Sequence, residues 1–296
     1  MIKNIAVIGA GTMGNGIAHV FAQYGFSVTL TDISQPALDK ALQTIAKNAE
    51  RQFSKGAITE ATKKAISTNL TTTDQLPEAV KNADLIIEAA TENKELKLKI
   101  FRQLDQLSTS SAILATNTSS ISVTALAAVT KKPGKVIGMH FMNPVPIMKL
   151  VEVIKGFVTE DAVTNAIVDL SKQLEKVPCV VNDYPGFIAN RILMPMINEA
   201  IYSLYEGIAG VESIDTIMKL GMAHPMGPLQ LADFIGLDVC LSILKVLQDG
   251  FGNPKYAPCP LLINMVAAGK LGAKSGEGFY IYTPGSKDLV VAPAFR

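Results

Sequence analysis

The stretch Gly9-Ala10-Gly11-Thr12-Met13-Gly14 decides how the first part of this chain folds. Its pattern, G-x-G-x-x-G, is a weak signal by itself because glycine is common. Here it follows an apolar run at residues 5–8 and opens a helical pattern at residues 14–24. In that context the glycines permit a tight turn, a close approach of backbone amides to a pyrophosphate, and close packing of helix on strand. The stretch predicts a strand–turn–helix unit whose helix N-terminus binds phosphates.

An acidic residue, Asp32, closes the next predicted strand at residues 26–31, 18 residues after Gly14. Its carboxylate is expected to accept hydrogen bonds from the adenosine ribose hydroxyls and to repel the additional phosphate of NADP. The residues that follow, Ile33 to Gln35, supply no arginine for that phosphate. NAD is therefore the expected cofactor. The alternative is a turn without a ligand, in which Asp32 only caps the backbone.

The rest of the chain shows two different rhythms. Up to residue 183, short apolar runs alternate with helical patterns, which predicts a mostly parallel sheet covered on both faces. Further strands are predicted at 68–73, 84–90, 112–117, 136–141, 149–154 and 177–181, and further helices at 36–55, 94–107 and 160–175. After the turn-rich residues 182–186, helical patterns dominate at 187–206, 211–220, 228–249 and 260–270. We predict an α/β domain over 1–183 and an all-helical C-terminal domain over 184–296, with Ser34 as the N-cap of the helix at 36–55.

Composition limits the possible partners. The 296 residues carry a formal net charge of +1, so no global field attracts nucleic acid or an acidic membrane. No stretch of about 18 apolar residues occurs, and no membrane span is expected. The three cysteines are far apart and form no C-x-x-C pair. They predict neither a disulfide framework nor a metal site and favour a reducing compartment, the cytoplasm.

Polar residues in apolar surroundings mark the predicted reaction site. Ser119 and His140 fall at or just after strand ends, where ligands collect in open α/β sheets. Hydride transfer needs a group that exchanges a proton with the substrate oxygen, and histidine suits this near neutral pH. Glu152, within an apolar strand, needs a partner because an isolated buried charge is costly. We expect it to pair with His140, fixing the imidazole and stabilising its protonated form.

Each of these residues also has a purely structural interpretation. His140 by itself is compatible with a hydrogen-bonded core histidine, and Glu152 with an exposed carboxylate on an edge strand. Ser119 is compatible with a turn or a helix cap, and Asn190, in the apolar helix that starts at Phe187, with a link between helices. Of the other histidines, His19 is expected to be a surface or packing residue and His224 a structural one.

Taken together, these motifs resemble the short-chain 3-hydroxyacyl-CoA dehydrogenase family, and within it the bacterial 3-hydroxybutyryl-CoA dehydrogenases. The resemblance runs from the glycine turn to about Tyr282. It is carried by residues 9–14, 117–120 (NTSS), 139–144 (MHFMNP), 185–191 (PGFIANR), 224–228 (HPMGP) and 276–280 (GEGFY). The family's fold is a Rossmann-type NAD domain followed by a helical domain that forms a homodimer interface. The resemblance implies the oxidation of 3-hydroxyacyl-CoA to 3-ketoacyl-CoA and the reverse reduction, in fatty acid or butanoate metabolism.

The resemblance also implies roles for single residues. His140 is implied as the general acid/base, Glu152 as the group that orients it, and Ser119 and Asn190 as hydrogen-bonding partners of the substrate. The implied NAD contacts are Gly9, Gly11, Thr12, Met13, Gly14, Asp32, Glu92, Lys97, Ser119, Asn143 and Lys274. The implied coenzyme A contacts are Asn48, Lys55 and Ser119, where Lys55 can otherwise be an ordinary solvated lysine. No metal is implied.

Two other functions are compatible with the same residues. One keeps the fold but changes the substrate to a free hydroxy acid or sugar acid, as in the related gulonate 3-dehydrogenases. The other is a non-catalytic NAD-binding structural protein, as some lens crystallins of this family suggest. The presence of Ser119, His140, Glu152 and Asn190 argues against the second.

Overall fold

The structure is a computed structural model that describes residues 2–286 and 288–296. Met1 and Lys287, which fall inside the two predicted domains, lie outside the described residues. The chain divides into two compact units, Met1–Tyr184 (unit 1) and Pro185–Arg296 (unit 2). Among the described residues, no helix is both long enough and apolar enough to cross a membrane.

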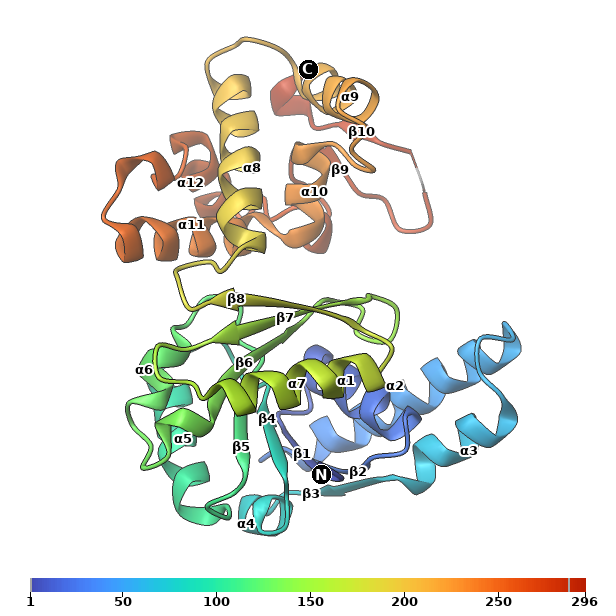
Figure 1. Ribbon diagram of the computed structural model, residues 1–296. Helices are drawn as coiled ribbons and strands as arrows, with labels where there is room; N and C mark the ends of the chain where they lie inside the picture. The colour runs from blue at the N-terminus through green and yellow to red at the C-terminus, as the bar shows by residue number, and fades with distance from the viewer. Residues whose placement is uncertain (1, 287) are drawn as a thin grey trace. The chain divides into compact units, whose positions relative to one another are not determined.

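Unit 1 is built on an eight-stranded sheet with the order β3-β2-β1-β4-β5-β6-β7-β8 (Figure 1). The strands are β1 Asn4–Ile8, β2 Ser27–Thr31, β3 Leu70–Thr73, β4 Leu85–Glu88, β5 Ile113–Thr116, β6 Val136–Phe141, β7 Leu150–Lys155 and β8 Val177–Asn182. All neighbouring pairs are parallel except β6 and β7, which run antiparallel. The central strands β4 and β5 are buried throughout. This explains why the first three residues of each are apolar, and the sheet confirms the predicted α/β class.

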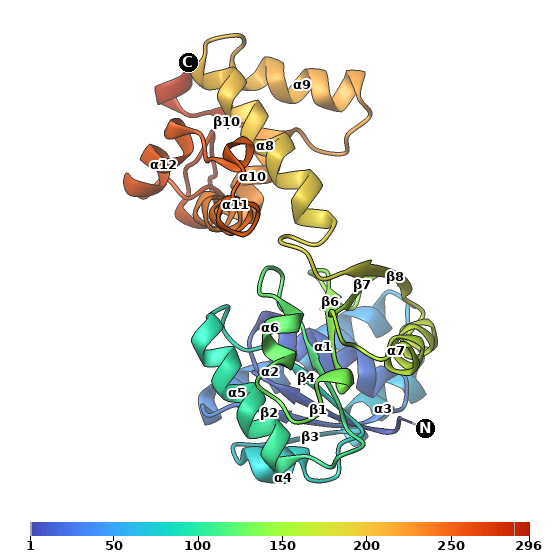
Figure 2. The ribbon, with the colours of Figure 1, turned by 60° about the vertical axis from the view of Figure 1, so that its left-hand side comes forward.

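Helices cover both faces of the sheet (Figure 2). They are α1 Thr12–Gln23, α2 Gln35–Ser54, α3 Glu60–Thr68, α4 Leu76–Val80, α5 Lys94–Leu107, α6 Val123–Ala127 and α7 Asp161–Gln173, with a 3-10 helix at Pro133–Lys135. One core cluster joins apolar side chains of α1, α2 and α7 to the sheet, including Phe21, Leu38 and Ile167. The Ser34 side chain accepts a hydrogen bond from the Ala37 N–H, which confirms it as the N-cap of α2.

Three helices of unit 1 were not predicted. α4 and α6 have five residues each, too short to show a helical period. α3 buries only Ile66 on its apolar face, but it has a clear start signal, because the Thr59 side chain accepts a hydrogen bond from the Thr62 N–H. The capping residue was therefore a better signal for α3 than its hydrophobic pattern.

Unit 2 is mostly helical, with α8 Ala189–Tyr205, α9 Val211–Gly221, α10 Pro228–Ile235, α11 Leu237–Phe251 and α12 Pro260–Ala267. It also has 3-10 helices at Pro254–Tyr256, Ala273–Ser275 and Pro293–Phe295, and a small antiparallel ribbon of β9 Tyr280–Ile281 and β10 Val290–Val291. This ribbon, with two residues per strand, departs from the predicted all-helical unit, as do the isolated β-bridges of Glu277 with Gly272 and Ile281. The segment after Thr283 lacks periodicity, yet it packs on the unit: the Ala292 N–H donates to the Phe279 carbonyl oxygen and Ala292 is buried.

The predicted single helix at 228–249 is two helices. Gly236 separates α10 from α11 and has a φ of 100°, a value that residues with a side chain rarely adopt. After this break the Leu237 N–H donates to the Leu271 carbonyl oxygen instead of continuing the helix of α10. The proline Pro195 lies inside α8, which continues through it.

Candidate active site

The glycine turn between β1 and α1 has the shape that a dinucleotide needs. Gly9 has a φ of 101°, and a Cβ atom on Gly14 would lie 1.7 Å from the Gly9 carbonyl oxygen, so both positions require glycine. A Cβ atom on Gly11, by contrast, would project into open space. Gly11 is the N-cap of α1 and provides no side-chain cap. The amides of the first helical turn therefore face a space that an anion can approach, and these residues fit the pyrophosphate of NAD.

Asp32 is fixed in position beside this turn. Its Oδ2 accepts a hydrogen bond from the Ala10 N–H at 2.8 Å, and its Oδ1 accepts one from the Ser34 N–H at 3.0 Å. The carboxylate thus ties the end of β2 to the glycine turn. Asp32, Gly9 and Gly11 line a cavity of about 580 Å³, which we call the outer cavity. A carboxylate oxygen has room for more than one hydrogen bond, so Asp32 can also accept hydrogen bonds from ribose hydroxyls.

A second cavity, of about 420 Å³, lies on the α2 side of the same turn. We call it the inner cavity. It is lined by Gly11, Thr12 and residues of α2, and it brings together Asn48 and Asn143, which the sequence assigned to coenzyme A and NAD. Lys55, the other predicted coenzyme A contact, is the exposed C-cap of α2 and does not line it. The peptide bond between Asn143 and Pro144 is cis.

Lys40 and Thr44 also line the inner cavity, although neither was predicted as a site residue from the sequence. They precede Asn48 on α2 at intervals of four residues, which places all three on one face of the helix. That spacing was the available signal. Lys40 gives the inner cavity a cation in a protein whose net charge is close to zero.

His140 and Glu152 form a hydrogen-bonded pair on the antiparallel strands β6 and β7. They are register partners, and His140 Nδ1 lies 2.8 Å from Glu152 Oε2. The Glu152 side chain is 3% exposed and the His140 side chain is 12% exposed, so the carboxylate is covered while the ring reaches the surface. An ionised Glu152 holds a proton on Nδ1, which makes Nε2 the ring nitrogen that exchanges a proton with another molecule.

Asn117 helps to place His140. The Phe141 N–H donates a hydrogen bond of 2.8 Å to Asn117 Oδ1, and the Asn117 N–H donates to the Glu88 carbonyl oxygen at 2.7 Å. Asn117 therefore connects the ends of β4, β5 and β6 beside the histidine.

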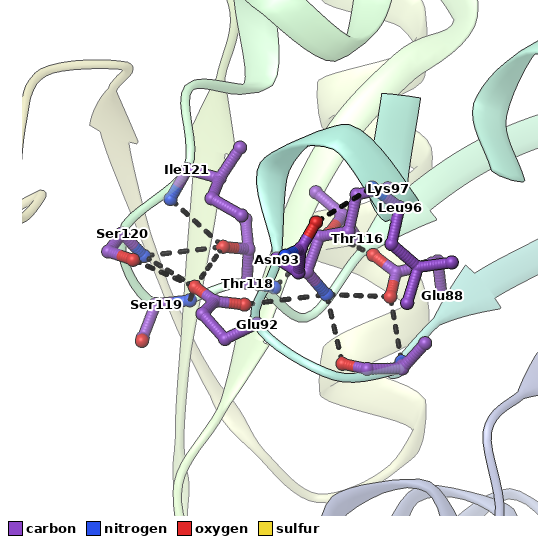
Figure 3. Close-up of polar contacts among 11 residues, drawn as sticks. Glu88, Glu92, Asn93, Leu96, Lys97, Thr116, Thr118, Ser119, Ser120 and Ile121 are labelled. Carbon is purple, nitrogen blue, oxygen red and sulfur yellow. Dashed lines mark hydrogen bonds and ion pairs between the residues drawn. The ribbon is translucent and has the colours of Figure 1, made fainter. Parts of the chain in front are cut away.

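Glu92 organises the loop that carries Ser119 (Figure 3). Its Oε1 accepts hydrogen bonds from the Ser119 N–H at 3.1 Å, from the Ser120 N–H at 3.2 Å and from the Thr118 hydroxyl at 2.5 Å. Burial raises the pKa of Glu92, but Lys97 and these hydrogen bonds outweigh it, so the net pKa lies below its ordinary value. Glu92 is thus an ionised anchor for the serine loop.

Lys97 connects this anchor to the core of the sheet (Figure 3). Its Nζ lies 2.6 Å from Glu88 Oε1 and 3.4 Å from Glu92 Oε2, and it donates to the Ala90 carbonyl oxygen at 3.1 Å. The side chains of Lys97 and Glu88 are 1% and 0% exposed. The other oxygen of Glu88 accepts a hydrogen bond from the Thr116 hydroxyl at 2.8 Å. One lysine therefore links strand β4, helix α5 and, through the two carboxylates, the end of β5 and the serine loop.

Two further predicted site residues, Asn190 and Lys274, lie in unit 2. Asn190 is the second residue of α8. Lys274 belongs to the 3-10 helix at Ala273–Ser275, and its Nζ lies 2.5 Å from Asp238 Oδ1. His224 lies between α9 and α10. His19, expected at the surface or in packing, is fully buried in α1.

Comparison with known proteins agrees with this geometry. Residues 4–184 match the model of the 3-hydroxyacyl-CoA dehydrogenase NAD binding domain, and residues 186–282 match the model of the C-terminal domain of the same family. The chain is 52% identical over 281 residues to the "Probable 3-hydroxybutyryl-CoA dehydrogenase" of Bacillus subtilis, covering 95% of this chain and 98% of that protein. It is 42% identical to the human "Hydroxyacyl-coenzyme A dehydrogenase, mitochondrial", covering 95% of this chain and 92% of that protein.

A solved structure gives the same result. The (S)-3-hydroxybutyryl-CoA dehydrogenase PaaH1 from Ralstonia eutropha superposes with a TM-score of 0.93 at 49% identity, covering 96% of this chain and 100% of that one. The glycine turn, the fixed Asp32 and the His140–Glu152 pair thus stand in a chain that resembles these proteins over nearly its whole length. The chain belongs to the 3-hydroxyacyl-CoA dehydrogenase family, and it is an NAD-dependent oxidoreductase.

Proposed function

We propose that the protein oxidises the 3-hydroxyl group of a 3-hydroxyacyl-CoA, with 3-hydroxybutyryl-CoA as the substrate, and catalyses the reverse reduction of acetoacetyl-CoA. The observation that carries this proposal is the His140–Glu152 pair, located in the NAD-binding unit of a chain about 50% identical to 3-hydroxybutyryl-CoA dehydrogenases. NAD, when bound, supplies the hydride acceptor of the oxidation.

His140 is the proposed general acid/base. In oxidation its Nε2 takes the proton of the 3-hydroxyl group, and in reduction it returns a proton to the same oxygen. Glu152 accepts from Nδ1 and thereby holds both the orientation and the tautomer of the ring. Because Glu152 is buried, it acts on the substrate only through His140.

NAD is proposed to lie along the glycine turn. The backbone of residues 9–14 binds the pyrophosphate, and Asp32 binds the adenosine ribose. Asn143 and Lys274 stay as proposed contacts from the family resemblance. The contacts of Glu92 and Lys97 support a positioning role for both. Glu92 holds the loop that carries Ser119, and Lys97 holds Glu92. Ser119 is in turn proposed to contact both NAD and the substrate. Asn190 is proposed as a second hydrogen-bonding partner of the substrate.

Coenzyme A is proposed to bind along α2. Asn48 lines the inner cavity together with Lys40, a cation that can pair with a phosphate of the substrate. Lys55, one residue beyond α2, is proposed to add a second cation at its end.

The predicted domain roles remain part of this proposal. Residues 1–183 are the proposed NAD-binding domain, and residues 184–296 are the proposed dimerisation and substrate domain. The dimer is supported by apolar side chains of unit 2 that are exposed in the single chain: Ile208 (71%), Ile217 (59%) and Leu220 (81%). Light scattering of the purified protein tests this assembly. The proposed compartment is the cytoplasm, consistent with three free cysteines.

Turnover with matched substrates tests the reaction. NADH oxidation should be fast with acetoacetyl-CoA, slow with free acetoacetate, and slow when NADPH replaces NADH. Equal rates with free acetoacetate would support the hydroxy-acid or sugar-acid alternative. Tight NADH binding without turnover on any 3-ketoacyl-CoA would support a non-catalytic protein.

A further inference from the structure

A second carboxylate borders the outer cavity beside Asp32. Asp74 follows β3 directly and lines the same space of about 580 Å³. Thr31 of β2 and Thr73 of β3 are register partners, so Asp32 and Asp74 are the first residues beyond two neighbouring, parallel strand ends. Adjacent strands are about 4.8 Å apart, which places the two residues next to each other along one edge of the sheet.

The order of the strands gives an order of binding groups. The glycine turn follows β1, Asp32 follows β2 and Asp74 follows β3, and these strands are neighbours in that sequence. With the pyrophosphate at the glycine turn and the ribose at Asp32, the next group of NAD in the same direction is the adenine base. Asp74 is therefore the first residue beyond the next strand along this edge, and it lines the cavity together with Lys99 of α5.

The walls of the outer cavity suit an aromatic base. Ile33 borders the cavity with 98% of its surface exposed, and Leu96 borders it with 39% exposed. Ile100, on the same helix as Leu96, adds a third apolar side chain. Exposing Ile33 and Leu96 in this way is unfavourable, and a planar base lying against them would remove their surface from water.

We propose that Asp74 accepts a hydrogen bond from the exocyclic amine of the adenine and so selects adenine over bases that carry a carbonyl oxygen there. Asp74 Oδ1 accepts a hydrogen bond from Gln75 Nε2 at 2.9 Å, and a carboxylate has further acceptor positions for an amine. The Thr73 hydroxyl oxygen accepts from the Gln75 N–H at 3.1 Å and orders the turn. This inference rests on the proposed function, because turnover is the first measure of cofactor choice.

The experiment compares NADH with reduced nicotinamide hypoxanthine dinucleotide, in which the amine is replaced by a carbonyl oxygen. kcat/KM with acetoacetyl-CoA is measured for the wild type, Asp74→Asn, Asp74→Ala and the control Asp169→Asn. Asp169 is an exposed carboxylate on α7 that pairs with Lys172, so its variant removes the same charge outside the cavity. NADPH is included to measure any effect on the 2′-phosphate.

The wild type should prefer NADH, and Asp74→Asn should lower that preference about tenfold, because the new amide can donate to the carbonyl of hypoxanthine. Asp74→Ala should lose NADH efficiency without gaining efficiency for hypoxanthine, and Asp169→Asn should match the wild type. An unchanged base preference in both Asp74 variants overturns the proposal. So does a gain in NADPH use without a change in base preference, which would assign Asp74 to charge exclusion.

A failure of the proposed reaction can be told apart from a failure of the proposed role of Asp74. If the wild type does not turn over acetoacetyl-CoA at all, the base preference is read from fluorescence titrations of the two reduced dinucleotides. These titrations need no turnover. The predicted tenfold change then appears in the ratio of the two dissociation constants, and its absence overturns the role of Asp74 independently of the reaction.

Discussion

His140 and Glu152 face each other across the antiparallel strands β6 and β7, with His140 Nδ1 2.8 Å from Glu152 Oε2. The strand register, and not only the side-chain contact, sets this relationship. Any change that keeps the strands keeps the two Cα positions, so single substitutions test the chemistry of each partner separately.

Replacing His140 with glutamine should remove the proton-exchanging group while keeping a side chain of similar size. We expect kcat to fall about 100- to 10,000-fold, the range of general acid–base catalysis. NADH affinity should stay within about twofold, since the outer cavity and the glycine turn are unchanged. Steady-state kinetics and a fluorescence titration measure the two effects, and a wild-type kcat would contradict the assigned role.

Replacing Glu152 with glutamine tests the tautomer argument. The glutamine amide can donate to Nδ1, which would move the ring proton to Nε2 and leave no base for the oxidation. We expect kcat for oxidation to fall by about 10- to 100-fold, with KM for NAD nearly constant, and the pH profile of kcat to change shape. If the profile keeps the wild-type shape and only protein stability changes, Glu152 has a purely structural role.

Replacing Asp32 with alanine should weaken NADH binding and relax the choice between NADH and NADPH. The substitution removes the acceptor for the ribose and the hydrogen bonds to the Ala10 and Ser34 N–H groups. Hydrogen bonds to charged groups contribute about 1.5–3 kcal/mol, so kcat/KM for NADH should fall about 10- to 100-fold. Asp32→Asn keeps one acceptor and serves as the control. An unchanged NADH-to-NADPH ratio in Asp32→Ala would refute the specificity role.

Replacing Lys97 with methionine tests the buried ion pair. The variant leaves the Glu88 carboxylate, which is 0% exposed, without its cation. Removing one partner of a buried pair lowers the free energy of unfolding by about 3–5 kcal/mol. Urea unfolding should show this loss in the unfolding transition that responds to added NADH. The control is Lys172→Met, from the exposed pair with Asp169, where the loss should stay below about 1 kcal/mol.

A second variant separates charge from packing at the same site. Glu88→Gln combined with Lys97→Met removes both charges, so its stability should exceed that of Lys97→Met alone. If the double variant is the less stable of the two, the uncompensated charge of Glu88 is not the cause of the loss.

His19 predicts a loss of stability in acid. Burial lowers its pKa from 6.5 to about 4, and the neighbouring Gln52 and Gln23 side chains offset only part of this effect. Between pH 6.5 and about 4, His19 is therefore protonated in the unfolded chain but mostly neutral in the folded chain. Stability falls as the pH drops from about 6.5 to about 4, by about 3 kcal/mol in total.

Replacing His19 with glutamine checks this pH dependence. The variant has no titrating group at this position, so its urea midpoint should vary less with pH between 4 and 6.5. His224→Gln, in unit 2, should keep the wild-type dependence. If His19→Gln loses stability in acid as steeply as the wild type, the buried imidazole is not the source.

The sequence predicted the centre of the sheet well because its strands are buried and mostly apolar, as in β4 and β5. It predicted the His140–Glu152 contact because a carboxylate within such a strand requires a partner. It did not predict the break at Gly236, because a single glycine does not show whether its φ is positive. It also missed Asp74 and Lys40, since exposed charged residues look alike until a cavity forms beside them.

The reversal of direction at β7 has a consequence for how this enzyme assembles. His140 and Glu152 are 12 positions apart in one hairpin, so a short loop closure brings them together. The dinucleotide site, in contrast, requires the glycine turn to meet Ala89 and Ala90, about 80 positions further along the chain. During folding, the proton-transfer pair can form early and locally, whereas the cofactor groove is completed only when distant strands have joined the sheet.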